Sequence, residues 1–94
     1  MRDILALKDL LRLTSDTNRL RILCLLTKKE RCVCEIFEAL QLPQNLVSHH
    51  LSKLKSLSLV EERREGTFII YRVNKKAIDR YRRLFDRVIK DQKI

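Results

Sequence analysis

The sequence contains very few residues that interrupt regular structure, with one glycine and one proline among its 94 residues. Tight turns depend on these two residue types, because glycine accepts a positive φ and proline fixes φ. The chain therefore has few places to turn, and helix is expected to dominate.

The sequence also lacks a long apolar run. No stretch is long enough to span a bilayer, and the amino-terminal segment MRDILALKDLL carries an acidic residue where a signal peptide needs an uninterrupted apolar region. We therefore expect a cytoplasmic protein without a membrane partner.

The features of an enzyme are missing as well. There is no Gly-rich phosphate loop, no carboxylate pair in a pocket-like context and no Cys-His-Asp order, so we expect no catalysis and no obligatory cofactor. Cysteine is scarce, and three residues make a poor disulfide framework. Two of them, Cys32 and Cys34, are separated by one residue, which favours a soft-metal or redox site.

Acidic residues are outnumbered by basic ones, 12 to 21, which gives a net charge of +9. This balance suits a polyanionic partner, although a basic surface also occurs in proteins that merely stay soluble. The chain is long enough for one core, and its remaining apolar surface favours a homodimer.

Apolar residues recur with helical spacing in four segments, which predicts helices over residues 4–13, 17–28, 33–40 and 44–56. Asp16 can cap the second helix. Cys32 and Glu35 stand where a capping box has Ser or Thr followed by Glu, and the choice of a poorly capping thiol indicates another task for the Cys32 sulfur. The third and fourth helices are short and are joined by a turn that contains Pro43. This is the pattern of a helix-turn-helix, with the turn and recognition helix over 41–57.

Residues 59–73 are rich in β-branched and aromatic residues around Gly66, which predicts a two-stranded hairpin, or wing. Asn74 can cap a last helix over residues 75–91. The expected fold class is mainly α with a β-hairpin wing: a winged helix-turn-helix of five helices, dimeric, with one domain over 1–94.

Four stretches of the chain resemble, in the right order, the ArsR/SmtB family of metal-responsive transcriptional repressors: DTNRLRILCLL at 16–26, ERCVCEIFEAL at 30–40, LPQNLVSHHLSKL at 42–54 and LVEERREGTFIIYRVN at 59–74. The resemblance implies a homodimer with helices 1–14 and 75–91 at its interface. It also implies an inverted-repeat operator in double-stranded DNA and a metal-resistance operon that is released from repression when a toxic ion binds.

The resemblance further implies a site for the inducing ion. In members that sense arsenic, antimony, cadmium or lead, a Cys-Val-Cys supplies ligands, and it maps onto Cys32 and Cys34. One arsenic-sensing pattern adds a third Cys where this chain has Phe37. Cys24 is either a buried small hydrophobe or that third ligand. The zinc site that other members build between their last helices needs His, which residues 75–94 lack.

Thiolates suit As(III), Sb(III), Cd(II), Pb(II) and Zn(II), and a helix start among basic residues favours the deprotonated sulfur. Side chains at i and i+2 of a helix point apart, so both sulfurs can reach one ion only if Cys32 lies at or outside the cap. Capture would then distort the first turn of the third helix.

The residues expected to contact DNA lie on the recognition helix and the wing. Candidates for base edges are Gln44, Asn45, Ser48 and His49. Candidates for phosphates are Lys53, Lys55, Arg63, Arg64 and Arg72. His50 is either a phosphate contact or a hydrogen-bonded packing residue.

Other interpretations stay open at this point. The two thiols can act as a redox switch, although the short loop between them argues that a disulfide would be strained, or they can have no sensing role. The chain can also be a thiol-based metal carrier or a winged helix used for protein contacts.

Overall fold

The computed structural model describes residues 1–91, and these form the predicted winged helix-turn-helix. The last three residues of the predicted domain, 92–94, lie outside the described residues. In chain order the elements are α1 (Arg2–Thr14), α2 (Thr17–Lys28), β1 (Arg31–Cys32), α3 (Val33–Leu40), α4 (Gln44–Ser56), β2 (Val60–Glu65), β3 (Phe68–Val73) and α5 (Lys75–Asp91).

The helix starts follow the capping residues found in the sequence. The Asp16 carboxylate accepts hydrogen bonds from the backbone N–H groups of Asn18 and Arg19, at 2.8 and 3.1 Å. The Asn74 side chain accepts one from the N–H of Ala77 at 3.2 Å, at the start of α5. These bonds satisfy backbone donors that have no partner within the helix, so both predicted caps are confirmed.

The sheet has one strand more than the sequence predicted. The wing strands β2 and β3 pair from Val60 opposite Val73 to Glu65 opposite Phe68, and Gly66 turns between them with a φ of +63°. The short strand β1 pairs with the other edge of β3, which gives the antiparallel order β1-β3-β2. The wing is thereby tied to the segment that immediately precedes α3.

The core lies where the helix-turn-helix packs on α2 and on the base of the wing. Apolar side chains from α2, α3, α4 and both wing strands meet there, which accounts for the helical spacing of the apolar residues in the sequence. Its buried members are Ile22, Leu26, Ile36, Val47, Leu51, Leu54, Leu59, Val60 and Val73.

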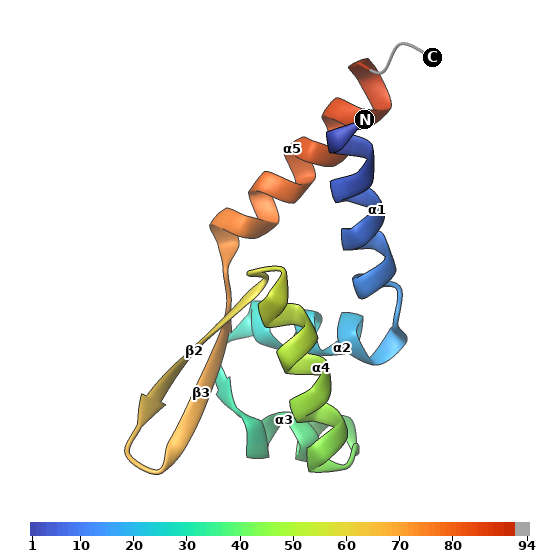
Figure 1. Ribbon diagram of the computed structural model, residues 1–94. Coiled ribbons are helices and arrows are strands. Elements are labelled where there is room, and N and C mark those ends of the chain that lie inside the picture. The colour runs from blue at the N-terminus through green and yellow to red at the C-terminus, as the bar shows by residue number, and fades with distance from the viewer. Residues whose placement is uncertain (92–94) are drawn as a thin grey trace.

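The helices at the two ends of the chain lie side by side, away from this core (Figure 1). Arg87 of α5 binds the carboxylate of Asp3 in α1, with 2.9 Å between Nε and Oδ2. Large apolar residues on this pair stay exposed: Leu5 (51%), Leu11 (50%), Phe85 (47%) and Ile89 (66%). No helix in the described part of the chain is long and apolar enough to cross a membrane.

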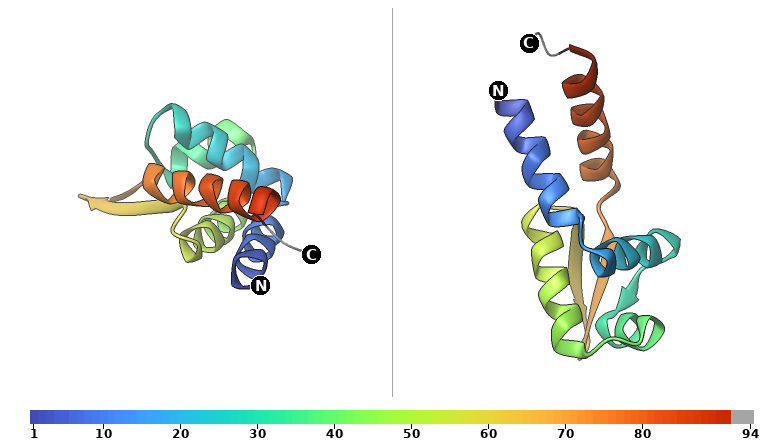
Figure 2. Two further views of the ribbon diagram at one scale, coloured as in Figure 1. Left: turned by 90° about the horizontal axis from the view of Figure 1, so that it is seen from above. Right: turned by 90° about the vertical axis from the view of Figure 1, so that its right-hand side faces the viewer.

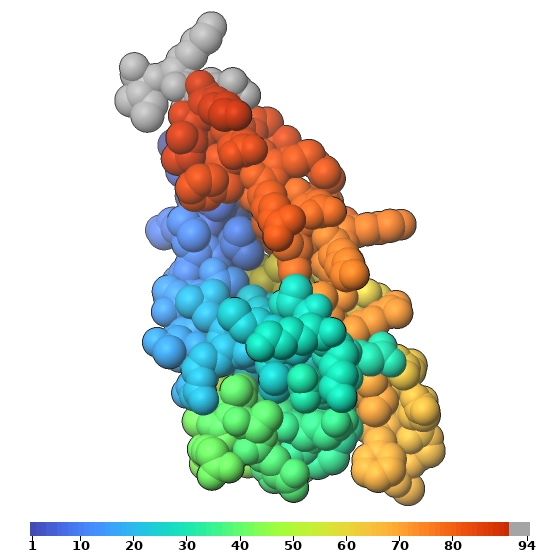
Figure 3. All heavy atoms as spheres, turned by 180° about the vertical axis from the view of Figure 1, so that it is seen from behind, coloured from blue at the N-terminus to red at the C-terminus, as the bar shows by residue number. Residues whose placement is uncertain are grey.

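The helices divide between two sides of the wing. In the right-hand view of Figure 2, α4 lies on one side of the β2–β3 hairpin and α2 lies on the other. Figure 3 looks at the α2 side, where the end of α2 and the start of α5 share one face. The helix α4 therefore lies on the opposite side of the hairpin from that surface.

Candidate nucleic-acid interface and thiol site

The exposed side of α4 carries the residues predicted to contact bases. The helix is amphipathic, with Val47, Leu51 and Leu54 buried in the core. Gln44, Asn45, Ser48 and His49 are exposed on its first two turns. An exposed helix of this length suits the major groove, where amide and hydroxyl side chains can hydrogen-bond to base edges.

His50 has a different place from its neighbour His49. Its side chain is buried, with 4% exposed, and its Nδ1 accepts a hydrogen bond of 3.0 Å from Nε of Arg19 in α2. Arg19 also donates to the carbonyl of Leu13 at the end of α1. His50 therefore packs α4 against the α1–α2 connection, and its burial corrects the expectation that it contacts phosphate.

Burial also sets the protonation of His50. Desolvation lowers the pKa of the imidazole, and Arg19 and His49 act in the same direction. The Asp16 carboxylate, 3.9 Å from Nε2, opposes the shift without cancelling it. The neutral ring fits the contact with Arg19, because Nδ1 must be unprotonated to accept that hydrogen bond.

Several predicted phosphate contacts are already paired with carboxylates of the same chain. Arg63 binds Glu30 at 2.6 Å and Glu65 at 2.9 Å, and the hydrogen bond to Arg63 lowers the pKa of Glu30. The other two pairs are Lys55 with Glu62, and Arg72 with Glu61 at 3.6 Å.

Lys53 and Arg64 differ from these three. Both side chains are exposed, and neither has an ion-pair partner within residues 1–90. This division could not be predicted from the sequence, because the carboxylate closest to Arg63 belongs to Glu30, far away in the chain.

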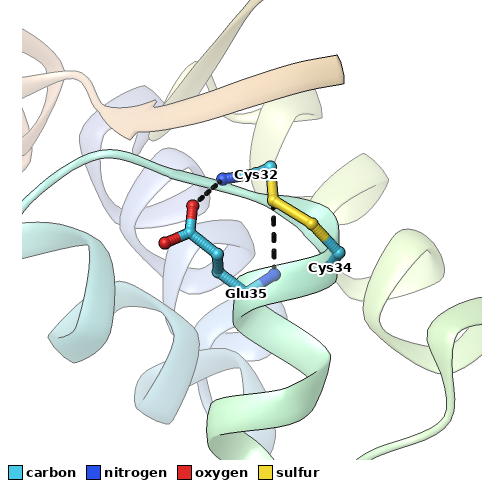
Figure 4. The surroundings of a disulfide bond; sticks show 3 residues. All are labelled: Cys32, Cys34 and Glu35. Carbon is cyan, nitrogen blue, oxygen red and sulfur yellow. Dashed lines mark hydrogen bonds between the residues drawn. A yellow bond between two sulfur atoms is a disulfide. The ribbon is translucent and has the colours of Figure 1, made fainter. Parts of the chain in front are cut away.

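The thiol site lies at the junction of β1 and α3 (Figure 4). Cys32 has extended backbone angles, φ −74° and ψ 162°, and is the N-cap of α3. Its sulfur accepts the N–H of Glu35 at 3.4 Å, and the Glu35 carboxylate accepts the N–H of Cys32 at 3.0 Å. The predicted capping box is confirmed, with sulfur in the place of the usual hydroxyl.

The sulfurs of Cys32 and Cys34 are joined in a disulfide, with the two Cα atoms 5.4 Å apart. The structure therefore contains the bond that the short loop was expected to disfavour. Cys32 lies outside the helix, so its side chain is free to turn toward that of Cys34. The same position lets both sulfurs reach a single soft ion once the disulfide has been reduced to thiols.

Cys32 also belongs to the sheet, which the sequence did not indicate. In β1 it stands opposite Ile70 of the wing strand β3. One residue therefore caps the first helix of the helix-turn-helix and pairs with a strand of the wing. A two-residue strand has no alternation of apolar and polar residues that could have revealed it.

The third-ligand candidate does not join this pair. Cys24 is exposed on α2, in a shallow groove with Leu20 and Leu40 that neither Cys32 nor Cys34 borders. Phe37, which occupies the place of a third Cys in one arsenic-sensing pattern, packs against the core. Within the described residues, no three or more His, Cys, Asp or Glu side chains are grouped to hold a metal ion.

Comparisons with known proteins agree with this architecture. A family model described as "Bacterial regulatory protein, arsR family" matches residues 16–62, which contain α2, the helix-turn-helix and the start of the wing. The chain is 37% identical over 73 residues to the arsenical resistance operon repressor of Staphylococcus aureus; the match covers 78% of this chain and 70% of that protein. It is 41% identical over 73 residues to the transcriptional repressor SmtB of Mycobacterium tuberculosis, covering 77% of this chain and 54% of SmtB.

A solved structure extends the likeness to the helices at both ends. The homodimeric winged helix-turn-helix DNA-binding domain of a possible ArsR-family regulator from Mycobacterium bovis superimposes with a TM-score of 0.71 at 28% identity. The superposition covers 98% of this chain and 83% of that one.

Proposed function

This chain belongs to the arsR family of bacterial regulatory proteins, and we propose that it is a homodimeric repressor of a metal or metalloid resistance operon. It is a DNA-binding transcriptional regulator rather than an enzyme. In the proposed mechanism the repressor leaves its operator when a thiophilic ion, such as As(III), Sb(III), Cd(II), Pb(II) or Zn(II), binds the reduced thiols of Cys32 and Cys34. One observation carries the proposal: the Cys32 sulfur caps the helix that leads into α4.

Operator binding is assigned to two surfaces. Gln44, Asn45, Ser48 and His49 would contact base edges in the major groove, since they are exposed on the first turns of α4. Lys53 and Arg64 would contact phosphates, because neither forms an ion pair within residues 1–90. An inverted-repeat operator follows from two copies of α4 related by the symmetry of a dimer.

Release is assigned to the cap of α3. A thiolate that donates its electrons to a soft ion becomes a weaker acceptor for the N–H of Glu35, so the capping box would loosen. Because Cys32 also pairs with Ile70, the change would reach the wing as well as the helix-turn-helix. Allosteric coupling is typically about 1 to 3 kcal/mol, which weakens operator binding roughly five- to 150-fold.

The disulfide favours a second candidate mechanism in the same repressor. A peroxide can take two electrons from the two thiols, which forms the Cys32–Cys34 disulfide, while the peroxide is reduced to water or an alcohol and water. The N–H of Glu35 then faces a disulfide sulfur instead of a thiolate. In this mechanism the operator is released by oxidation and no ion is required.

One set of DNA titrations tests both candidates. Reduced protein is titrated onto fluorescent DNA from upstream of its gene, alone and with each of the five ions, and then without reductant in the presence of peroxide. The proteins compared are wild type, Cys32→Ser/Cys34→Ser, and Cys24→Ser as the matched single-thiol control.

We expect wild type and Cys24→Ser to release DNA with at least one ion, and the double variant to bind DNA but to ignore that ion. Release of the double variant by the same ion would refute sensing at these thiols. If peroxide releases the DNA and none of the ions does, the redox mechanism would take the place of the ion-binding mechanism. Absence of low-salt binding to the DNA would refute the repressor itself.

A further inference from the structure

A basic cleft lies on the α2 side of the molecule, between the end of α2, the base of the wing and the start of α5 (Figure 3). Its volume is about 710 Å³, within the range of small-molecule pockets. We define the basic cleft by its cationic lining residues, which are Lys28, Lys29, Arg72, Lys75, Lys76 and Arg80. Two of them also belong to features described above: Arg72 lies at the base of the wing, and Lys28 borders the groove around Cys24.

The charges in the basic cleft are not balanced by the chain itself. Its two carboxylates are both engaged, Glu30 with Arg63 and Glu61 with Arg72. The four lysines and Arg80 have no side-chain hydrogen bond or ion pair within residues 1–90. Five cations therefore line one concave space without an ion pair of their own, and the two carboxylates of the lining are paired with other arginines.

The position of Lys75 and Lys76 adds to the imbalance. They begin α5, and the first turn of this helix has no acidic residue. Cations are unfavourable at a helix N-terminus, which carries the positive end of the helix dipole. An anion bound in the basic cleft would relieve both this repulsion and the repulsion among the lysines.

The shape and lining indicate which anion. We propose that the basic cleft binds a small molecule with two or more linked phosphate groups, such as a free oligophosphate or the phosphate tail of a nucleotide. Several cations spread over three segments match several charged groups better than one. The lining has no aromatic side chain on which a base could stack, so the phosphates are the recognised part. Operator DNA on α4 would lie on the other side of the wing and leave the cleft open.

The test is calorimetric titration of the reduced full chain at low salt with inorganic phosphate, pyrophosphate, triphosphate and ATP. Saturable binding of one triphosphate per chain is expected, with affinity rising from phosphate to triphosphate. Lys75→Gln/Lys76→Gln should weaken triphosphate binding about ten-fold or more, because two charged contacts are lost. The matched control Arg82→Gln/Arg83→Gln removes two exposed charges of the same helix outside the cleft and should stay within about two-fold.

Equal affinities for ATP and triphosphate would show that the cleft recognises the phosphates alone. A higher affinity for ATP would show that it recognises a nucleotide. Either result supports the site. The proposal fails if wild type shows no saturable binding, if both double variants lose affinity equally, or if operator DNA displaces triphosphate competitively. Arg80→Gln is the alternative variant if Lys75→Gln/Lys76→Gln does not fold, as judged by circular dichroism.

Discussion

The side chain of Cys32 has two tasks whose chemical requirements differ. As the N-cap of α3 it accepts the N–H of Glu35, a role in which Ser or Thr normally stabilises a helix better. As the proposed ligand it must also bind a soft ion, which a hydroxyl cannot do. A sulfur at this position therefore links the proposed ion binding to the start of the helix-turn-helix. It stabilises the helix start less than a hydroxyl would.

Two substitutions of Cys32 should change the stability of the reduced protein in opposite ways. Cys32→Ala should lower the free energy of unfolding by about 0.5 to 2 kcal/mol, because the cap is lost. Cys32→Ser should keep or raise it, since the hydroxyl caps well. Urea unfolding followed by circular dichroism checks both values, and an Ala variant as stable as the Ser variant would show that the sulfur does not cap α3.

The buried side chain of His50 predicts a pH dependence of stability. The buried, neutral His50 has a lowered pKa, so below about pH 6.5, the ordinary value for histidine, the unfolded state binds more protons than the folded one. The free energy of unfolding should therefore decrease as the pH falls from 7.5 to 5.5, and the loss should become complete below the folded-state pKa.

His50→Gln should show a smaller decrease over this interval, because glutamine can accept from Arg19 without titrating. The exposed neighbour provides the control: His49 makes only the smallest contribution to the lowered pKa of His50, so His49→Gln should keep most of the wild-type decrease. If the slope with pH persists in His50→Gln, the titrating group lies elsewhere.

At the scale of the element, the wing presents two adjacent arginines in different environments. Arg63 is held by Glu30 and Glu65, while Arg64 forms no ion pair within residues 1–90 and only lowers the pKa of Glu62 through its charge. Successive residues of a strand point to opposite faces, which separates them although they are neighbours in sequence. We therefore expect Arg64, and not Arg63, to contact a phosphate.

Arg64→Gln should weaken DNA binding about uniformly across sequences and reduce the slope of log affinity against log salt by about 1. Arg63→Gln should leave the slope nearly unchanged. Titrations at four salt concentrations measure both slopes. Equal reductions in the two variants would mean that DNA displaces the carboxylates from Arg63.

Most elements could be predicted from the sequence because their signals are local. The apolar spacing of α2 and α4, the caps at Asp16 and Asn74, and Gly66 in the wing each act within a few residues. The strand β1 could not be predicted, since it exists only through its pairing with β3.

The candidate site was predictable to a similar extent. The exposed face of α4 follows from its periodicity, which places Asn45 and Ser48 opposite the core. The burial of His50 and the pairing of Arg63 with Glu30 depend on contacts between distant segments. Sequence spacing carries no information about such contacts.

For the whole molecule, the exposed apolar residues of α1 and α5 indicate a second copy of the chain. Leu5 and Ile89 are about half or more exposed on the paired end helices, away from the predicted DNA surface. A dimer through these helices would place two copies of α4 on one operator.

Ile89→Lys should therefore convert dimers into monomers at micromolar concentration and weaken operator binding, as measured by analytical ultracentrifugation and DNA titration. Phe68→Lys is the matched control, because Phe68 is similarly exposed at 56% but lies at the tip of the wing. An unchanged dimer in Ile89→Lys, or an equal loss in Phe68→Lys, would contradict this interface.

The central claim is that an ion at Cys32 and Cys34 and the operator bound by α4 oppose each other. Coupling between two binding sites is reciprocal, so it must appear in the affinity for the ion as well as in the affinity for DNA. The decisive measurement is titration of the inducing ion into reduced free protein and into the protein–operator complex. The account predicts that the complex binds the ion roughly five- to 150-fold more weakly. Equal affinities would contradict it, because the thiols would then bind the ion without any influence on DNA.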